Sequence, residues 1–126
     1  MAGVKMDGAG IVKMTTLDEA LTQLQRVHTN VEQWALASKK NQPTSLYTMQ
    51  LRRQLPTLAA LLKGQFGMIS DQVTAMYMAS SRGASDAPKV RALREGVAQV
   101  RVALEIAVAQ TKEKHEVHEE KVPRPD

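Results

Sequence analysis

Apolar residues recur at spacings of three and four along three stretches of the chain, which is the pattern of helices that bury one face. The first stretch runs from Leu17 to Ala35, the second from Leu51 to Met76 and the third from Val90 to Val108. No segment alternates apolar and polar residues over a length that would make a useful strand, and no internal repeat is visible. The pattern therefore predicts an all-α chain.

The first helix is expected to begin at Thr15 or Thr16. Thr16 and Glu19 have the spacing of a capping box, in which the hydroxyl and the carboxylate satisfy free backbone N–H groups of the first turn. The sequence Asn41-Gln42-Pro43 should end this helix, because proline cannot continue it. Residues 1–14 contain three glycines and no apolar periodicity, so we expect a flexible leader there.

The second apolar stripe passes straight through Pro56, and proline disfavours helical angles in the residue before it. We therefore expect one long helix that kinks at Pro56, with two shorter helices split near that residue as the alternative. On this interpretation Gly64 and Gly67 lie inside the helix and serve packing. The segment Ser80-Ser81-Arg82-Gly83 should end it.

The third stretch follows Ser85-Asp86-Ala87-Pro88, which combines N-cap side chains with a proline in the first turn. Beyond Gln110 the apolar pattern gives way to charged residues, which we expect to continue the helix with weak packing. The predicted fold is an antiparallel bundle of three long helices, or of four if the second one splits. A single helical-bundle domain would span residues 15–121, and residues 122–126 would form a disordered tail.

The last helix carries a second apolar strip opposite its core-facing stripe, and the helix before it carries a strip of small residues. In a bundle of three helices, the neighbours cannot easily cover a second apolar face on two of the helices. Soluble monomers rarely expose large apolar patches. We therefore expect a homo-oligomer in which these faces meet across a symmetric interface. The alternative is that the last helix lies centrally and contacts neighbours all round. The residues expected to form the self-association face are Ala98, Val102, Ile106, Ala109, Ala60, Gly64 and Gly67.

The chain has a formal net charge of +4, with 17 Lys and Arg against 13 Asp and Glu. Positive residues dominate between residues 39 and 101, whereas glutamates gather in the C-terminal segment. Such a basic surface can hold nucleic-acid phosphates or an acidic patch on a protein. The residues expected to form this basic patch are Lys39, Lys40, Arg52, Arg53, Lys89, Arg91, Arg94 and Arg101.

Composition excludes several kinds of site. The chain has 0 cysteines, which excludes disulfides, thiolate metal sites and a cysteine nucleophile. Aromatic residues make up only 3%, so an aromatic ladder for stacking nucleic-acid bases is not expected. No P-loop, dinucleotide-binding glycine motif or serine-hydrolase motif is present. We therefore predict no catalytic residues, no cofactor and no enzymatic activity.

The three histidines offer the remaining candidate chemistry. His28 lies on the apolar stripe of the first helix, so we expect a partly buried, hydrogen-bonded structural histidine. His115, His118 and Glu119 can share one helix face and could ligate a zinc or nickel ion weakly. A solvated charged face is the better interpretation, because these ligands lie on a terminal segment without an HExxH motif, and no metal site is predicted.

We therefore expect a non-catalytic scaffold or adaptor module that self-associates through apolar helix faces and presents a basic surface to a partner protein. The alternative is a basic accessory protein that binds RNA or DNA backbone without sequence specificity. The longest apolar run, Leu55–Leu62, holds 8 residues. A membrane-spanning helix needs about 20. Since no signal peptide is recognisable either, we expect a cytoplasmic protein without membrane association.

Overall fold

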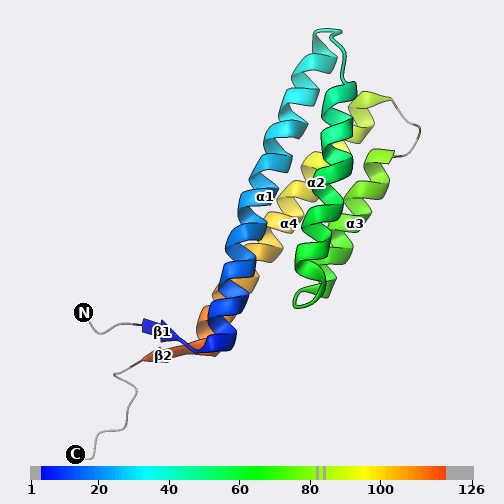
Figure 1. Ribbon diagram of the computed structural model, residues 1–126. Coiled ribbons are helices and arrows are strands. Elements are labelled where there is room, and N and C mark those ends of the chain that lie inside the picture. The colour runs from blue at the N-terminus through cyan, green and yellow to red at the C-terminus, as the bar shows by residue number, and fades with distance from the viewer. Residues whose placement is uncertain (1–3, 82, 84, 119–126) are drawn as a thin grey trace, which may run out of the picture.

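The chain folds into an up-down-up-down bundle of four helices (Figure 1). It is described here from a computed structural model that covers residues 4–81, 83 and 85–118. Each helix packs against the next one along the chain, and the last helix returns to lie against the first. The predicted all-α class is confirmed, with four helices rather than three. These helices are α1 (Gly8–Lys39), α2 (Ser45–Lys63), α3 (Gly67–Ser81) and α4 (Asp86–His115).

The core is built from the apolar stripes that the sequence pattern identifies. Leucine and valine dominate it, and Trp34 is its one fully buried aromatic side chain among the described residues. Burial of each such side chain stabilises the fold by about 1.5–3 kcal/mol relative to exposure. The residues of the core that are fully shielded from solvent are Leu17, Leu24, Val27, Val31, Trp34, Leu51, Leu55, Leu58, Leu62, Val73, Leu93, Val100 and Leu104, together with Ala20.

The second predicted helix breaks at residues 64–66 and not at Pro56. Helix α2 runs through Pro56 without interruption, and the chain turns between Lys63 and Gly67. Pro56 is exposed, so the carbonyl group that it leaves without an N–H partner lies on the solvent side of the helix. The apolar stripe continues past the turn because α2 and α3 face the same core. Spacing alone therefore could not reveal the reversal of direction.

The first helix begins at Gly8, seven residues before the earliest predicted start, so residues 8–14 do not belong to a leader. Asp7 is the N-cap, and its Oδ1 accepts a 2.7 Å hydrogen bond from the backbone N–H of Gly10. Thr15 and Thr16 do not cap the helix. Their hydroxyls donate to the carbonyl groups one turn earlier, as hydroxyls inside a helix do.

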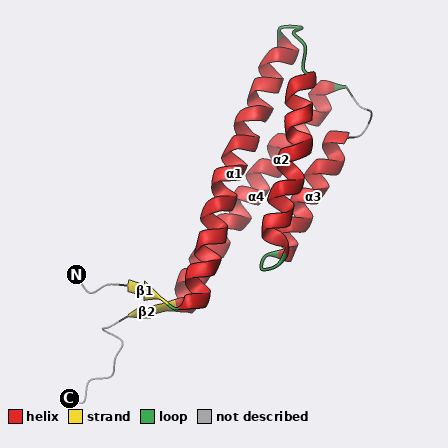
Figure 2. Ribbon diagram, in the orientation of Figure 1, coloured by secondary structure: helices red, strands yellow, loops and turns green. Residues whose placement is uncertain are grey.

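Helices α1 and α4 extend beyond the α2–α3 turn and carry both ends of the described chain (Figures 1 and 2). Helix α1 has 32 residues and α4 has 30, against 19 in α2 and 15 in α3. At the end of this projection β1 (Val4–Met6) pairs antiparallel with β2 (Glu116–His118). The sequence pattern missed these strands because three residues are too few to show alternation. The predicted tail at 122–126 lies outside the described residues.

Three side chains join α1 to the end of α4 beside the strands. His115 Nδ1 lies 3.1 and 3.2 Å from the carboxylate oxygens of Asp7, and His115 Nε2 lies 3.2 Å from Lys13 Nζ. A lysine ammonium can only donate, so Nε2 accepts and Nδ1 donates its proton to Asp7. The close fit also needs Gly10, because a Cβ atom there would lie 2.5 Å from the Cβ of His115. We call Asp7, Lys13 and His115 the terminal clasp.

Replacement of Pro56 by alanine should raise the free energy of unfolding by about 2 kcal/mol, because alanine restores the missing backbone N–H and removes the ring from a helix interior. Urea unfolding followed by circular dichroism measures this change. Ala60→Pro, one turn further along the same exposed face, should lower the free energy of unfolding. A loss of stability in Pro56→Ala would mean that the proline contributes to the native packing.

The terminal clasp should make the melting temperature of the protein depend on pH in the acidic range. The hydrogen bond from the Gly10 N–H, and then that from His115, hold the pKa of Asp7 below its ordinary value of 3.8. The carboxylate therefore stabilises the folded chain above that pH, and the contribution is lost as pH falls through the lower folded-state pKa. Asp7→Ala should lower the melting temperature at pH 7, and its difference from the wild type should shrink as the pH falls below 3.8.

Asp7→Asn separates the two parts of this effect, because its amide oxygen can still accept from Gly10 while the charge opposite Lys13 is gone. Its melting temperature at pH 7 should lie between those of the wild type and Asp7→Ala. Asp71→Ala, on the exposed side of α3, provides a control without a hydrogen-bonded carboxylate. A melting-temperature difference for Asp7→Ala that is independent of pH would contradict the prediction.

Candidate functional site

The outward side of α4 carries the second apolar strip predicted from the sequence. Val102 and Ile106 are 54% and 52% exposed, although both are large and apolar. Helix α4 packs against α1 and α3 through its other sides. The alternative that α4 lies centrally, with neighbours all round, is therefore wrong. The strip is surface, and it consists of Ala98, Val102, Ile106 and Ala109, which we call the α4 strip.

The small residues of the predicted self-association face are divided between two sides of the bundle. Gly67 opens α3, next to α4, and lies in one hollow with Ile106. Ala60 is exposed on α2 and Gly64 is exposed just beyond its end, and α2 neighbours α1 and α3 and lies across the bundle from α4. The structure therefore brings Gly67 to the α4 strip and keeps Ala60 and Gly64 away from it.

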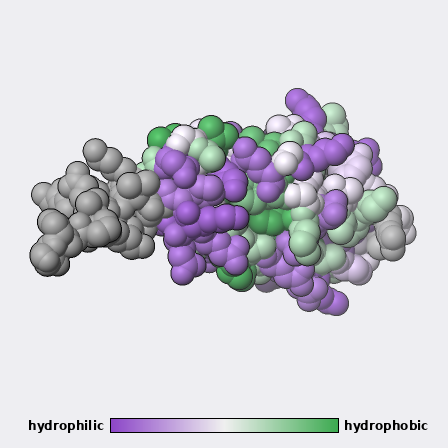
Figure 3. All heavy atoms as spheres, turned by 90° about the horizontal axis from the view of Figure 1, so that it is seen from below, coloured by the Kyte–Doolittle hydropathy of each residue, from purple (hydrophilic) through white to green (hydrophobic). Residues whose placement is uncertain are grey.

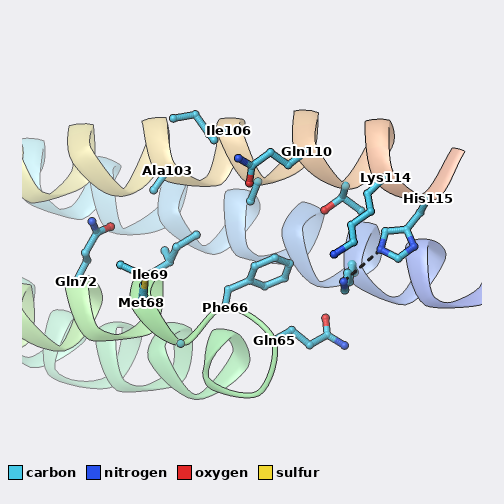
Figure 4. A pocket seen from close by; sticks show the side chains of 14 residues that line it. Gln65, Phe66, Met68, Ile69, Gln72, Ala103, Ile106, Gln110, Lys114 and His115 are labelled. Atoms are coloured by element: carbon cyan, nitrogen blue, oxygen red, sulfur yellow. Dashed lines mark hydrogen bonds between the residues drawn. The ribbon is translucent and has the colours of Figure 1, made fainter.

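A groove of about 480 Å³ lies where α3 begins and α4 continues past it (Figure 4). Its walls are mostly apolar, with Phe66 and Met68 on one side and Ala103 and Ile106 on the other. Met68 is 84% exposed, the highest value among the exposed large apolar residues of the described chain. The groove extends the α4 strip sideways onto α3, so the two form one apolar region.

One end of this groove is cationic. Lys13 and Lys114 line it together with His115, and the dashed line in Figure 4 is the contact between Lys13 and the imidazole. Because Lys13 occupies Nε2, the histidine does not present a free base to the groove. His115 thus links Asp7 to Lys13 beside the apolar groove.

Apolar surface on the underside of the molecule is interrupted by polar side chains. Seen from below, hydrophobic residues form separate clusters between hydrophilic ones (Figure 3). Among the described residues, the large apolar side chains that are at least half exposed also include Ile11, Val12, Leu36, Leu46, Met49 and Met78. These residues are spread over several helices, so exposure alone does not single out the α4 strip.

The eight residues of the predicted basic patch do not share one surface. Lys39, Arg91 and Arg94 line a hollow of about 420 Å³ between the end of α1 and the start of α4. Arg53 lines a different hollow between α1 and α2, and Arg52 precedes it on α2. The remaining members, Lys40, Lys89 and Arg101, lie in the α1–α2 turn, the first turn of α4 and the middle of α4.

Two of these cations are already engaged within the bundle. Arg94 Nε and Nη2 donate to the two carboxylate oxygens of Glu32 at 2.8 and 2.7 Å, which links α4 to α1. The pair lowers the pKa of Glu32 and raises that of Arg94, in each case chiefly through these hydrogen bonds. Arg101 Nη2 donates to Gln25 Oε1 at 3.2 Å. The charge available to a partner is therefore smaller than the sequence suggests.

The histidine predictions have mixed outcomes. His28 is half-buried as expected, but its buried Nδ1 has no hydrogen-bond partner among the described residues, so the expected hydrogen bond is missing. His115 joins the terminal clasp. The side chain of His118 and all of Glu119 lie outside the described residues. Within the part of the chain that the structure describes, no three His, Asp or Glu side chains come together as a metal site.

A furrow lined by polar residues lies between α1 and α2 and was not predicted from the sequence pattern. Gln25, Arg26, Asn30 and Gln54 line it, and Arg53 alone was among the predicted binding residues. A signal was present, because Gln23, Arg26, Asn30 and Gln33 recur at helical spacing beside the apolar stripe of α1. Recognising it requires the knowledge that α2 lies alongside.

Comparisons with known proteins assign no relative to this chain. No family model, no curated protein and no solved structure matches it. Across the described residues, none of the helices has both the length and the apolar character needed to cross a membrane. The functional conclusion therefore depends on the surfaces described above.

Proposed function

We propose that this protein is a non-catalytic scaffold that self-associates through the α4 strip and offers its basic end to an acidic partner protein. The observation that carries the proposal is the alignment of Val102 and Ile106, each more than half exposed, with Ala98 along one side of a well-packed helix. Burying two such side chains per chain across an interface removes apolar surface from water.

The α4 strip is suited to pairing with a second copy of itself. Ala98 and Ala109 are small, so two α4 helices can approach closely around Val102. In an antiparallel pairing centred on Val102, Ala98 lies opposite Ile106 of the second copy, because both are four residues from the centre. A two-fold axis repeats this contact, so one strip supplies both halves of the interface.

Charge also favours this antiparallel register. Arg91 and Glu113 are both exposed and both eleven residues from Val102, so each lies opposite the other across the same two-fold axis. The interface would then contain two Arg–Glu pairs at its ends and apolar side chains at its centre, which is the usual arrangement of a protein interface.

The basic end is the surface that such an assembly leaves for a partner. Lys39 and Lys40 end α1, and Lys89 lies in the first turn of α4. These helix ends lie together, since Lys39 lines a common hollow with the start of α4. Positive charge gathered at this end of each chain, so that the antiparallel dimer carries one basic end at either side, would attract an acidic protein surface and speed its encounter.

Val102→Glu combined with Ile106→Glu should yield a folded monomer, because two buried carboxylates per chain cannot be accommodated at a two-fold interface. Light scattering on a sizing column measures the molar mass, and circular dichroism checks the fold. Leu46→Glu with Met49→Glu adds the same charge at two exposed apolar residues of α2 and should leave the molar mass unchanged. Unfolding of the first variant, or an equal loss of association in both, would overturn the proposal.

Charge reversal tests the register. Arg91→Glu alone and Glu113→Arg alone should each weaken the dimer about three- to tenfold, because each places like charges opposite one another at both ends of the interface. The double variant Arg91→Glu/Glu113→Arg should return the dissociation constant to within about twofold of the wild type. Sedimentation equilibrium measures the three constants, and additive losses would rule out this pairing.

A further inference from the structure

A continuous furrow lined by polar residues runs between α1 and α2. It consists of two hollows, of about 230 and 210 Å³, which share Arg26 and Gln54. Neither hollow is lined by an apolar or acidic side chain. The lining residues are Gln23, Gln25, Arg26, Thr29, Asn30, Gln33, Gln50, Arg53, Gln54 and Thr57.

Asn30 gives this furrow a buried acceptor without a partner. The residue is 3% exposed, and its Nδ2 donates to Tyr47 O at 3.0 Å and to Gln54 Oε1 at 3.3 Å. Both partners are carbonyl oxygens, which fixes the orientation of the amide. Oδ1 is buried and accepts no hydrogen bond from the described residues. A buried acceptor left in this way lowers the stability of the bundle.

The rest of the furrow presents donors. The oxygens of Gln25 and Gln54 are occupied, since Gln25 Oε1 accepts from Arg101 and Gln54 Oε1 accepts from Asn30. Their NH₂ groups are therefore the ends that remain to donate. Arg26 and Arg53 add two guanidinium groups. The carboxylate of Glu19 accepts a hydrogen bond from Gln23 Nε2 at 3.0 Å and does not line either hollow.

We propose that this furrow binds the sugar–phosphate backbone of a single-stranded nucleic acid. Arg, Gln, Asn and Thr are the side chains by which proteins hold phosphate oxygens and sugars. Arg26 and Arg53 line the same hollow and supply the positive charge that phosphate groups require. The lining contains no apolar side chain against which an anchoring residue of a peptide could pack. The absence of aromatic side chains in the lining means that bases are not stacked, so binding tolerates any sequence.

This proposal goes beyond self-association and does not depend on it, because the furrow lies on α1 and α2 whereas the α4 strip lies on α4. It also differs from the basic patch predicted from the sequence, of which only Arg53 lines the furrow. Arg52 lines neither hollow although it adjoins Arg53 in the chain, and this difference provides the control.

The test measures binding of the full chain to labelled oligouridine and oligothymidine of twelve nucleotides by fluorescence anisotropy, in low and moderate salt. Arg26→Gln with Arg53→Gln should weaken binding at least tenfold and lower the slope of log affinity against log salt by about 1.4, since each phosphate that is no longer neutralised accounts for about 0.7. Arg52→Gln with Lys63→Gln removes the same charge from α2 outside the furrow. This control should change affinity by less than about threefold.

A neutral variant tests the amides separately. Gln33→Ala with Gln50→Ala should weaken binding several-fold and leave the salt slope unchanged, because no charge is removed. Tighter binding of oligouridine than of oligothymidine would identify RNA as the source of the backbone, and the reverse would identify DNA. Three results overturn the proposal. Neither strand binds, or the Arg26→Gln/Arg53→Gln variant and the Arg52→Gln/Lys63→Gln control lose affinity equally, or polyglutamate binds more tightly than either strand.

Discussion

Burial of one apolar stripe from each of four helices is the constraint on which the rest of the structure depends. With few aromatic residues, the core is filled by leucine, valine and alanine around a single buried Trp34. Each helix can satisfy this constraint with about a third of its circumference, which leaves the remaining sides to solvent, to neighbouring helices or to partners. The apolar residues on the outer side of α4 therefore do not contribute to the monomer's core.

The unequal lengths of the helices shape the rest of the molecule. Because α1 and α4 extend past the α2–α3 turn, one end of the bundle consists of only two helices (Figure 1). The apolar groove lies at the step where α3 begins, and the terminal clasp lies further along the projection. Asp7 serves both as the N-cap of α1 and as the partner of His115, so one carboxylate links helix initiation to the joining of the two ends.

Polar contacts between helices decide which charges remain available. Glu32 forms a salt bridge with Arg94, and Gln25 accepts a hydrogen bond from Arg101, so two cations of the predicted patch stabilise the α1–α4 contact. The furrow between α1 and α2 has the opposite character, since its arginines lie among amides and hydroxyls and no carboxylate lines it. Net charge along the sequence therefore says little about where an anion could bind. The position of each counter-charge matters more.

The sequence by itself determined the helical class, the core-facing stripes, the end of α1 and the start of α4, because helix periodicity and capping are local properties of the chain. It also identified Val102 and Ile106 as a second apolar face. Only the tertiary structure decided the turn at 64–66, the start of α1 at Gly8 and the pairing of Met6 with Glu116. It likewise brought Asn30 beside Gln54. These features depend on the direction in which helices run and on which helices become neighbours, and a stripe of apolar residues carries neither kind of information.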